Sequence, residues 1–131
     1  MGEENTWIPR SIYQGGFHFI DFTDIDNPVE TAIYQVPEVG SHNHWVEGDI
    51  LYAGYYYGGI RVLDISGELL GDLYAQGREI AFFEGRDPNG KIPNETNVWG
   101  VIPYKGLIYF ADHYNGLWAV KLVDDETMGT N

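Results

Sequence analysis

The residues of this chain whose types and spacing could do chemistry are histidines with carboxylates near them. His42 and His44 are two residues apart, so on a β-strand their side chains would share one face, as a pair of metal ligands does. His18 and the adjacent Asp112 and His113 come from equivalent regions of other repeats, and four histidines with carboxylates nearby could bind a transition metal. One hypothesis is therefore a metal-dependent enzyme, or a metal-stabilised site, that uses His42, His44 and His113.

A structural role for the same positions is the other hypothesis. Asn43 follows His42, and Asn97 occupies the equivalent place later in the chain with no histidine beside it. An asparagine that recurs without its histidine favours hydrogen bonds to the backbone at the start of a strand. We therefore assign no metal and no cofactor, and we take these positions as candidates for binding. The full set of binding candidates is His42, Asn43, His44, Tyr55, Tyr56, Asn97, Asp112 and His113.

Other motifs of catalysis are weak or missing. Asp24, Asp26 and Asn27 offer oxygen ligands of the kind that calcium prefers, but the glycine and the glutamate of an EF-hand loop are missing from the required positions. Asp, Asn and Pro also favour turns, which is the interpretation we prefer. No serine lies in a G-x-S-x-G motif, and the chain has no cysteine. We expect no catalytic activity.

Charge excludes further classes of function. Seven basic residues against 20 acidic ones give a net charge of −13, which opposes binding to nucleic acid or to anionic lipid. No apolar run approaches the ~20 residues that a transmembrane helix requires. The first residues, Met1 to Thr6, lack the basic and apolar regions of a signal peptide, although a signal peptide removed from the chain would leave no trace.

Aromatic residues and glycine predict an all-β fold. Phe, Trp and Tyr make up 15% of the chain, and 17 residues are Gly. Short aromatic or β-branched segments bounded by Gly, Asn, Asp or Pro are typical of strands. The predicted strands cover 17–22, 50–57, 60–65, 78–83, 107–111 and 117–122. The segment 69–77 contains two glycines, which favour a loop or a single helical turn over a long helix.

Internal repetition organises these strands. A turn that ends in glycine and then a strand occur three times, at 15–22, 58–65 and 115–122. Trp45 and Trp99 each follow an asparagine by two residues, so we expect both rings to be buried between repeats. The spacing of Gly16 and Gly59 is 43 residues, whereas that of Gly59 and Gly116 is 57. The excess fits an insertion around 85–96, and a period near 43 is typical of propeller blades.

At these repeats the chain resembles the LVIVD-repeat β-propeller family. The matching segments are GGFHFIDFTDIDNPVE at 15–30, SHNHWVEGDILYAGYYYGGIRVLDIS at 41–66 and NVWGVIPYKGLIYFADHYNGLWAVKL at 97–122. The resemblance implies β-propeller blades, with about two and a half repeats of an antiparallel four-stranded sheet. We therefore divide the chain into an N-terminal arm at 1–12, a partial propeller at 13–122 and a polar tail at 123–131.

Two and a half blades do not close a ring, since propellers commonly have four to eight. We therefore expect a fragment or subunit of a larger extracytoplasmic assembly, periplasmic or secreted. Its function would be that of a non-catalytic binding or scaffold module whose partners are other protein chains, or further copies, that complete or cap the propeller. Tyr55 and Tyr56 could anchor a protein or a carbohydrate, since aromatic residues dominate interface hot spots. The insertion at 85–96 is expected to overhang one mouth of the ring and to take part in recognition.

Overall fold

The computed structural model describes residues 15–124, which contain ten β-strands arranged in three sheets. The expected N-terminal arm and most of the expected tail lie outside these residues. No helix forms in the described range, and so none there is long enough to cross a membrane. The all-β prediction is confirmed. The strands are β1 Gly16–Asp21, β2 Val29–Gln35, β3 His44–Glu47, β4 Ile50–Tyr55, β5 Gly59–Asp64, β6 Gly71–Asp72, β7 Glu79–Phe83, β8 Val98–Tyr104, β9 Leu107–Asp112 and β10 Gly116–Val120.

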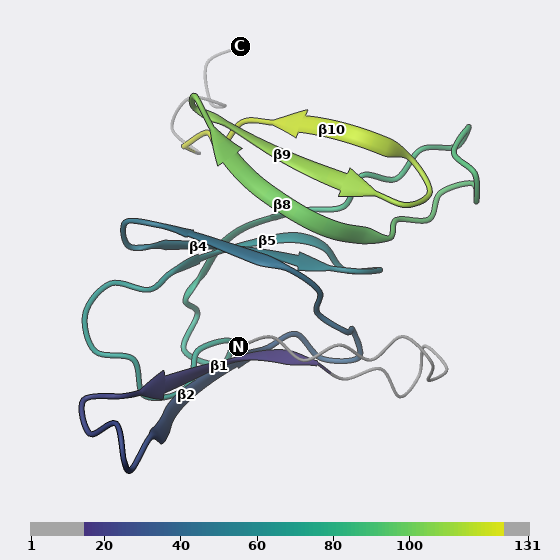
Figure 1. Cartoon of the computed structure of the whole chain (residues 1–131). Helices are drawn as coiled ribbons and strands as arrows, with labels where there is room; N and C mark the ends of the chain where they lie inside the picture. The colour runs from purple at the N-terminus through teal and green to yellow at the C-terminus, as the bar shows by residue number, and fades with distance from the viewer. Residues whose placement is uncertain (1–14, 125–131) are drawn as a thin grey trace.

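The three sheets stack on one another, with the four-stranded sheet in the middle (Figure 1). The middle sheet has the order β3-β4-β5-β7, and every neighbouring pair in it is antiparallel. The last sheet has the order β10-β9-β8, also antiparallel. The first sheet pairs β1 with β2 antiparallel and adds the two-residue β6 in parallel. That parallel pair departs from the expected blade, because the connection from β5 to β7 reaches back to the first sheet.

Two apolar layers hold the stack together. Successive side chains of a strand point to opposite faces, so β5 serves both layers: Leu63 packs toward the first sheet, whereas Ile60 and Val62 pack toward the last. Burial of each such side chain contributes about 1.5–3 kcal/mol. The layer between the first and middle sheets contains Phe17, Ala32, Tyr34, Val36, Leu51, Ala53, Tyr55, Leu63 and Leu73. The layer between the middle and last sheets contains Ile60, Val62, Val98, Val101, Ile108 and Phe110.

A buried arginine adds a polar tie between the first and middle sheets. Arg61 of β5 donates its Nε–H to the Gly58 carbonyl at 3.0 Å and forms an ion pair with Glu79 of β7 at 3.3 Å. The hydroxyl of Tyr34, on the first sheet, donates to the same carboxylate. Burial and the neighbouring carboxylate raise the pKa of Tyr34, so this hydroxyl keeps its proton and remains the donor. The charge of Arg61 is thus paired inside the layer rather than left unsatisfied.

Most predicted strands are present, but the tryptophan prediction is wrong. Trp45 is 47% exposed and Trp99 is 43% exposed, so neither ring is buried between sheets. Both lie on the first strand of their sheet, β3 or β8, which has a neighbour on one side alone. A strand with one neighbour leaves its side chains less covered. The segment 69–77 forms the two-residue β6 and then turns, in which the N–H of Gln76 donates to the Asp72 carbonyl at 3.1 Å, as the predicted loop or single helical turn allows. Strands β2, β3, β6 and β8 lie outside the predicted strand ranges.

The repeated glycines at the strand starts offer a stability test with a matched control. Gly59 and Gly116 both have positive φ, 74° and 84°, which strains any L side chain. A Cβ on Gly59 would also lie 2.1 Å from the carbonyl oxygen of Phe83, whereas no atom of the described chain lies within 4 Å of a Cβ on Gly116. We expect Gly59→Ala to lower the free energy of unfolding by about 2–5 kcal/mol and Gly116→Ala by about 1–2 kcal/mol. Urea unfolding of both variants tests this; equal losses would contradict it.

Candidate functional site

Trp99 is the centre of a cluster of aromatic side chains at one end of the stack. The ring of His42 stacks on it, with 5.1 Å between ring centroids and 28° between the planes. His113 meets it edge-on at 5.2 Å, and Tyr56 does so at 6.4 Å. These four residues come from the approach to β3, the end of β4, the start of β8 and the turn after β9. The cluster therefore joins the middle sheet to the last sheet.

Backbone hydrogen bonds fix the position of Trp99. Its carbonyl oxygen accepts from the Nδ1–H of His42 at 2.9 Å and from the N–H of Asn43 at 3.1 Å. A Cβ on Gly54 would lie 2.7 Å from this oxygen, so the close approach of the two sheets requires glycine there. Next to it, the N–H of Val98 donates to the Tyr56 carbonyl at 2.8 Å. The starts of the two sheets thus lie side by side.

Asp112 organises the turn beneath the cluster. Its buried carboxylate accepts from the Thr96 hydroxyl at 2.5 Å and from the backbone N–H of Asn97 at 3.2 Å. It also accepts from the N–H groups of Tyr114 at 2.8 Å and Asn115 at 3.1 Å. A carboxylate that satisfies so many donors is a structural anchor rather than a free general base.

The insertion between β7 and β8 lies against this same turn. The side-chain amide of Asn115 donates to the carbonyl oxygens of Gly85 and Glu95 at 2.6 and 2.8 Å, so it forms hydrogen bonds with both ends of the insertion. The N–H of Lys91 donates to the Tyr114 carbonyl at 3.0 Å. The insertion therefore reaches the end of the molecule that carries His113. Its part in recognition stays a prediction.

The structure gathers most of the predicted binding residues and separates two of them. Tyr55 is wholly buried between the first and middle sheets, where its hydroxyl donates to the Tyr34 carbonyl at 3.1 Å, so its ring cannot meet a partner. His44 packs edge-on against Phe17 at 5.1 Å, on the side of the first sheet. The residues that contact Trp99 or support its surroundings are His42, Asn43, Tyr56, Asn97, Asp112 and His113.

The metal hypothesis needs His42, His44 and His113 to converge, and the geometry does not bring them together. His42 and His113 flank Trp99, whereas His44 contacts Phe17. Across residues 15–124, no group of three or more His, Asp or Glu side chains could hold a metal ion.

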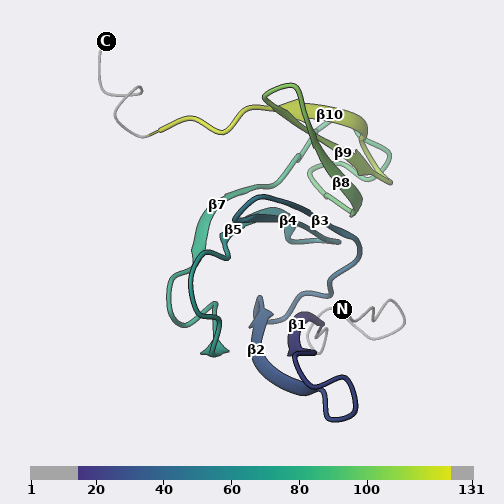
Figure 2. The ribbon, with the colours of Figure 1, turned by 60° about the vertical axis from the view of Figure 1, so that its left-hand side comes forward.

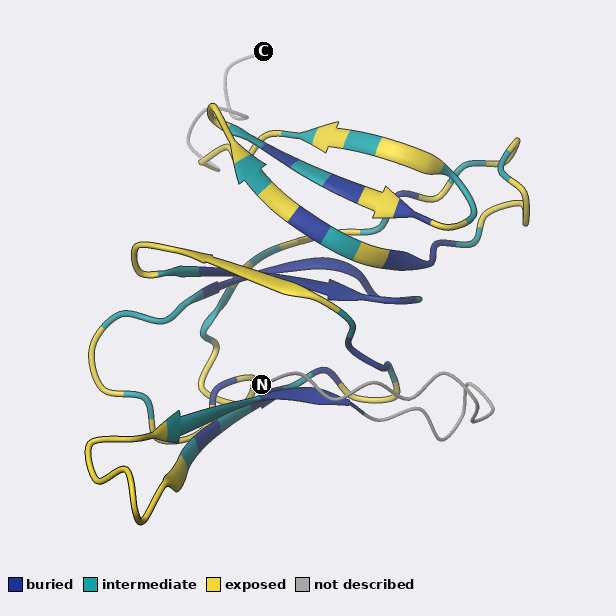
Figure 3. Ribbon diagram, in the orientation of Figure 1, coloured by how far each residue is buried: buried dark blue, intermediate teal, exposed yellow. Residues whose placement is uncertain are grey.

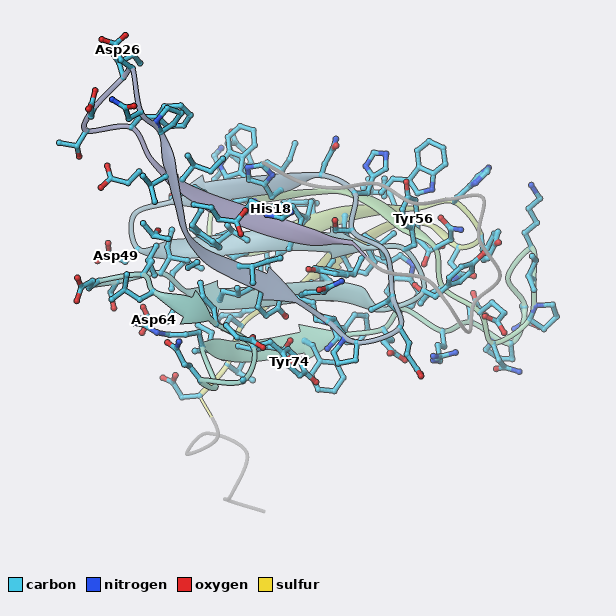
Figure 4. The ribbon with its side chains drawn as sticks, turned by 90° about the horizontal axis from the view of Figure 1, so that it is seen from below. His18, Asp26, Asp49, Tyr56, Asp64 and Tyr74 are labelled. Carbon is cyan, nitrogen blue, oxygen red and sulfur yellow. The ribbon has the colours of Figure 1, made fainter. Side chains whose placement is uncertain are left out.

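The aspartates of the first turn are also accounted for by hydrogen bonds. The carboxylate of Asp24 accepts from the N–H of Asp26 at 3.1 Å and from the Asn27 amide at 2.9 Å. The hydrogen bond from the side-chain amide of Asn27 lowers the pKa of Asp24. Figure 4 shows Asp26 at the tip of this turn, well away from Tyr56. The interpretation of 24–27 as a turn is thus confirmed.

The outer face of the last sheet is a second candidate site, which sequence reasoning missed. Alternate residues of β8, β9 and β10 point away from the middle sheet, and much of the surface of this sheet is exposed (Figure 3). Leu117 is 77% exposed, although Ile60, its equivalent after the repeated glycine, is 2% exposed. Aligning the repeats could have identified the face, because equivalent residues point to equivalent sides. Its residues are Gly100, Ile102, Tyr109, Ala111 and Leu117, with Tyr104 beyond them.

The Asp112 network gives a stability prediction. Asp112→Ala removes the acceptor of several buried or half-buried donors, so we expect the free energy of unfolding to fall by about 2–4 kcal/mol. His113→Ala, at the exposed neighbouring position, should cost less than ~1 kcal/mol. Parallel urea titrations of the two variants measure the difference. Similar losses in both would show that Asp112 is not the anchor of the turn.

His44 gives a pH prediction. His44 is largely exposed, but its ring packs against Phe17, and this partial burial lowers its pKa below the ordinary value of 6.5. The unfolded chain therefore binds a proton at this residue more readily than the folded chain, and stability falls as the pH drops below 6.5. We expect His44→Phe, which keeps a ring beside Phe17, to lose less stability than the wild type between about pH 7.5 and about pH 5. Urea unfolding at the two pH values measures this, and an identical loss in both proteins would contradict it.

Comparisons with protein-family models, with curated proteins and with solved structures found no match. The two surfaces that carry a functional argument are therefore the Trp99 cluster and the outer face of the last sheet, each defined by the contacts of this chain alone.

Proposed function

We propose that this chain forms blades of a β-propeller of the LVIVD-repeat type and acts as a non-catalytic binding or scaffold module for other protein chains. Support comes from the middle sheet, in which β3, β4, β5 and β7 follow one another as antiparallel neighbours. Sequential four-stranded antiparallel sheets are the units of a propeller. Further support comes from the stacking of the three sheets through two apolar layers.

The exposure of Leu117 is the observation that carries the proposal. Ile60 and Leu117 follow equivalent glycines and point to the same side of their sheets, but Ile60 is covered by the last sheet and Leu117 is not. The last sheet thus presents, on its outer face, the kind of surface that the middle sheet buries. Exposed apolar faces of this kind mark sites of protein association. We propose that an apolar sheet face of another chain covers this surface.

The Trp99 cluster borders that face and would extend it. Trp99 is half-exposed and Tyr104 is exposed, and both residue types contribute strongly to binding at interfaces. Such a role explains why an aromatic ring at this position remains open to solvent instead of packing between sheets.

The other expectations from the sequence stay predictions. They are an extracytoplasmic location, a larger parent assembly and the lack of catalysis. The metal-dependent alternative has no support from the positions of His42, His44 and His113, which face different neighbours.

A charge introduced on the outer face tests the proposed function. We expect the wild-type chain to self-associate with rising concentration and Leu117→Asp to remain a monomer, because a carboxylate cannot be buried in an apolar contact. The side chain of Leu117 is exposed in the monomer, so the substitution should change the free energy of unfolding of the chain by less than ~0.5 kcal/mol. Analytical ultracentrifugation measures the association.

Ile25→Asp is the matched control, since Ile25 is equally exposed but lies in the turn between β1 and β2. This variant should associate like the wild type. A wild-type chain that stays monomeric at every concentration and melts cooperatively would contradict the proposal.

A further inference from the structure

The last sheet differs from the middle sheet at one edge. In the middle sheet, β5 pairs with β4 on one side and with β7 on the other. In the last sheet, β10 pairs with β9, and no strand of residues 15–124 pairs with its outer edge. β10 is the counterpart of β5, since each begins with a glycine of positive φ. Figure 2 shows β7 along the outer side of the middle sheet. No described strand occupies the corresponding position beside β10.

The glycine that begins each strand shows what an adjoining strand needs. A Cβ on Gly59 would collide with the Phe83 carbonyl of β7, and one on Gly16 would lie 2.8 Å from the Tyr34 carbonyl of β2. Both glycines thus make room for the backbone of the strand that follows in their sheet. Gly116 shares the positive φ of Gly59, but no described atom lies within 4 Å of a Cβ placed on it. It leaves room for a carbonyl oxygen that no described residue supplies.

An apolar groove runs beside this open edge. It has a volume of about 320 Å3 and lies between the outer part of the middle sheet and the end of β10. Its apolar side chains come from both sheets and from the chain after β10. They are Ile60, Val62, Ala81, Phe82, Phe83, Ile108, Val120, Leu122 and Val123. A strand added to β10 would place alternate side chains in this groove.

Trp118 supplies a third difference. Its counterpart in the middle sheet is Arg61, whose guanidinium is paired with Glu79 of β7. The indole N–H of Trp118 is buried and has no hydrogen-bond partner among the described residues. A buried donor without a partner costs about 1–3 kcal/mol. The Cε2 atom bonded to this nitrogen lies 3.0 Å from the position of a Cβ on Gly85, so an acceptor carried by a fourth strand reaches the N–H only when the ring turns away from Gly85.

We propose that the outer edge of β10 binds an extended segment of another polypeptide as an antiparallel fourth strand. The segment matches β7 in its chemistry: about five residues, apolar side chains at alternate positions and a carboxylate near Trp118. This inference goes beyond the proposed function, because it concerns backbone pairing at an edge rather than packing on a face. Addition of a strand to a sheet edge is a common mode of peptide recognition.

The backbone groups that would pair can be named from the middle sheet. The N–H of Asp64 donates to Arg78, ahead of β7, whereas the N–H of Ile65 donates to Asp49, ahead of β4. The backbone N–H groups alternate between the two neighbouring strands, so those of Ile60, Val62 and Asp64 face β7, while the Ile60 and Val62 side chains point to the last sheet. The counterparts in the last sheet are Leu117, Ala119 and Lys121. Their N–H groups are the donors available to an added strand.

The test uses the full chain and a capped peptide with the sequence of residues 78–84, Arg-Glu-Ile-Ala-Phe-Phe-Glu. Amide hydrogen exchange is followed by NMR as the peptide is added. We expect exchange at Leu117 and Ala119 to slow by about tenfold or more, with little change at Trp118 and Val120, whose amides face β9. The same peptide, methylated at the amide nitrogens that face β5 in the intact chain, should not slow exchange.

Two substitutions at one position separate edge pairing from packing. Ala119→Pro removes the N–H on the open edge and should abolish binding, whereas Ala119→Val keeps it and should bind within about twofold of the wild type. Ile102→Asp alters the outer face from β8, at the opposite edge of the sheet from β10, so it should bind the peptide even where self-association is lost. Failure of the two proposals is therefore distinguishable.

Several results would overturn the inference. One is the lack of slowed exchange up to the solubility limit of the peptide, and another is equal binding of the methylated peptide. Slow exchange at Leu117 and Ala119 without peptide, at concentrations where the chain is monomeric, would also overturn it, because the edge would then be paired within the chain. Protection that instead rises with protein concentration supports pairing at this edge and identifies the occupant as a second copy of the chain.

Discussion

Strand alternation is the constraint on which the rest of this structure depends. In a sheet with a polar face, every second residue can meet water, but β5 has apolar or paired side chains on both faces. Ile60 and Val62 point toward the last sheet, whereas Arg61 and Leu63 point toward the first. A sheet of this kind needs a neighbour on each side. The stack of three sheets follows from that need, and so does the exposed face at its end.

The repeated sequence predicts the strands well because glycine, turn residues and alternation are local signals. It fails where a side chain's environment depends on which strands lie at an edge. Trp45 and Trp99 share one offset, but β3 and β8 each have a single neighbour, and the rings remain half-exposed. β2 escapes prediction because VETAIYQ mixes polar and apolar residues and pairs through contacts that no local pattern shows. Local signals therefore define elements better than they define burial.

The candidate site shows the same division. The repeat accounts for the approach of the segments that begin at Asn43 and Asn97, where the N–H of Asn43 donates to the Trp99 carbonyl, because equivalent strand starts of adjacent sheets lie together. His44 and Tyr55 are near them in sequence but point to the opposite face, toward Phe17 and Tyr34. Trp99 itself could not be recognised as the centre of the cluster from the sequence. Its role depends on the contacts of its ring with two histidines from segments that are far apart in the chain.

The repeats also differ in how they satisfy equivalent positions. Arg61 and Trp118 occupy the same place after their glycines, yet one is paired with a carboxylate of the next strand and the other has a buried N–H without a described partner. Both residues are hydrogen-bond donors, but Arg61 lies on a strand that has β7 as its outer neighbour, whereas Trp118 lies on the outermost described strand of its sheet. In the middle sheet, β7 provides both the acceptor and the backbone that Gly59 leaves room for. The last sheet keeps the donor and the glycine of that arrangement. The exposed face and the unpaired edge of the last sheet thus have one explanation. Its residues match those of the middle sheet, which is packed on both faces and whose β5 is paired with β7.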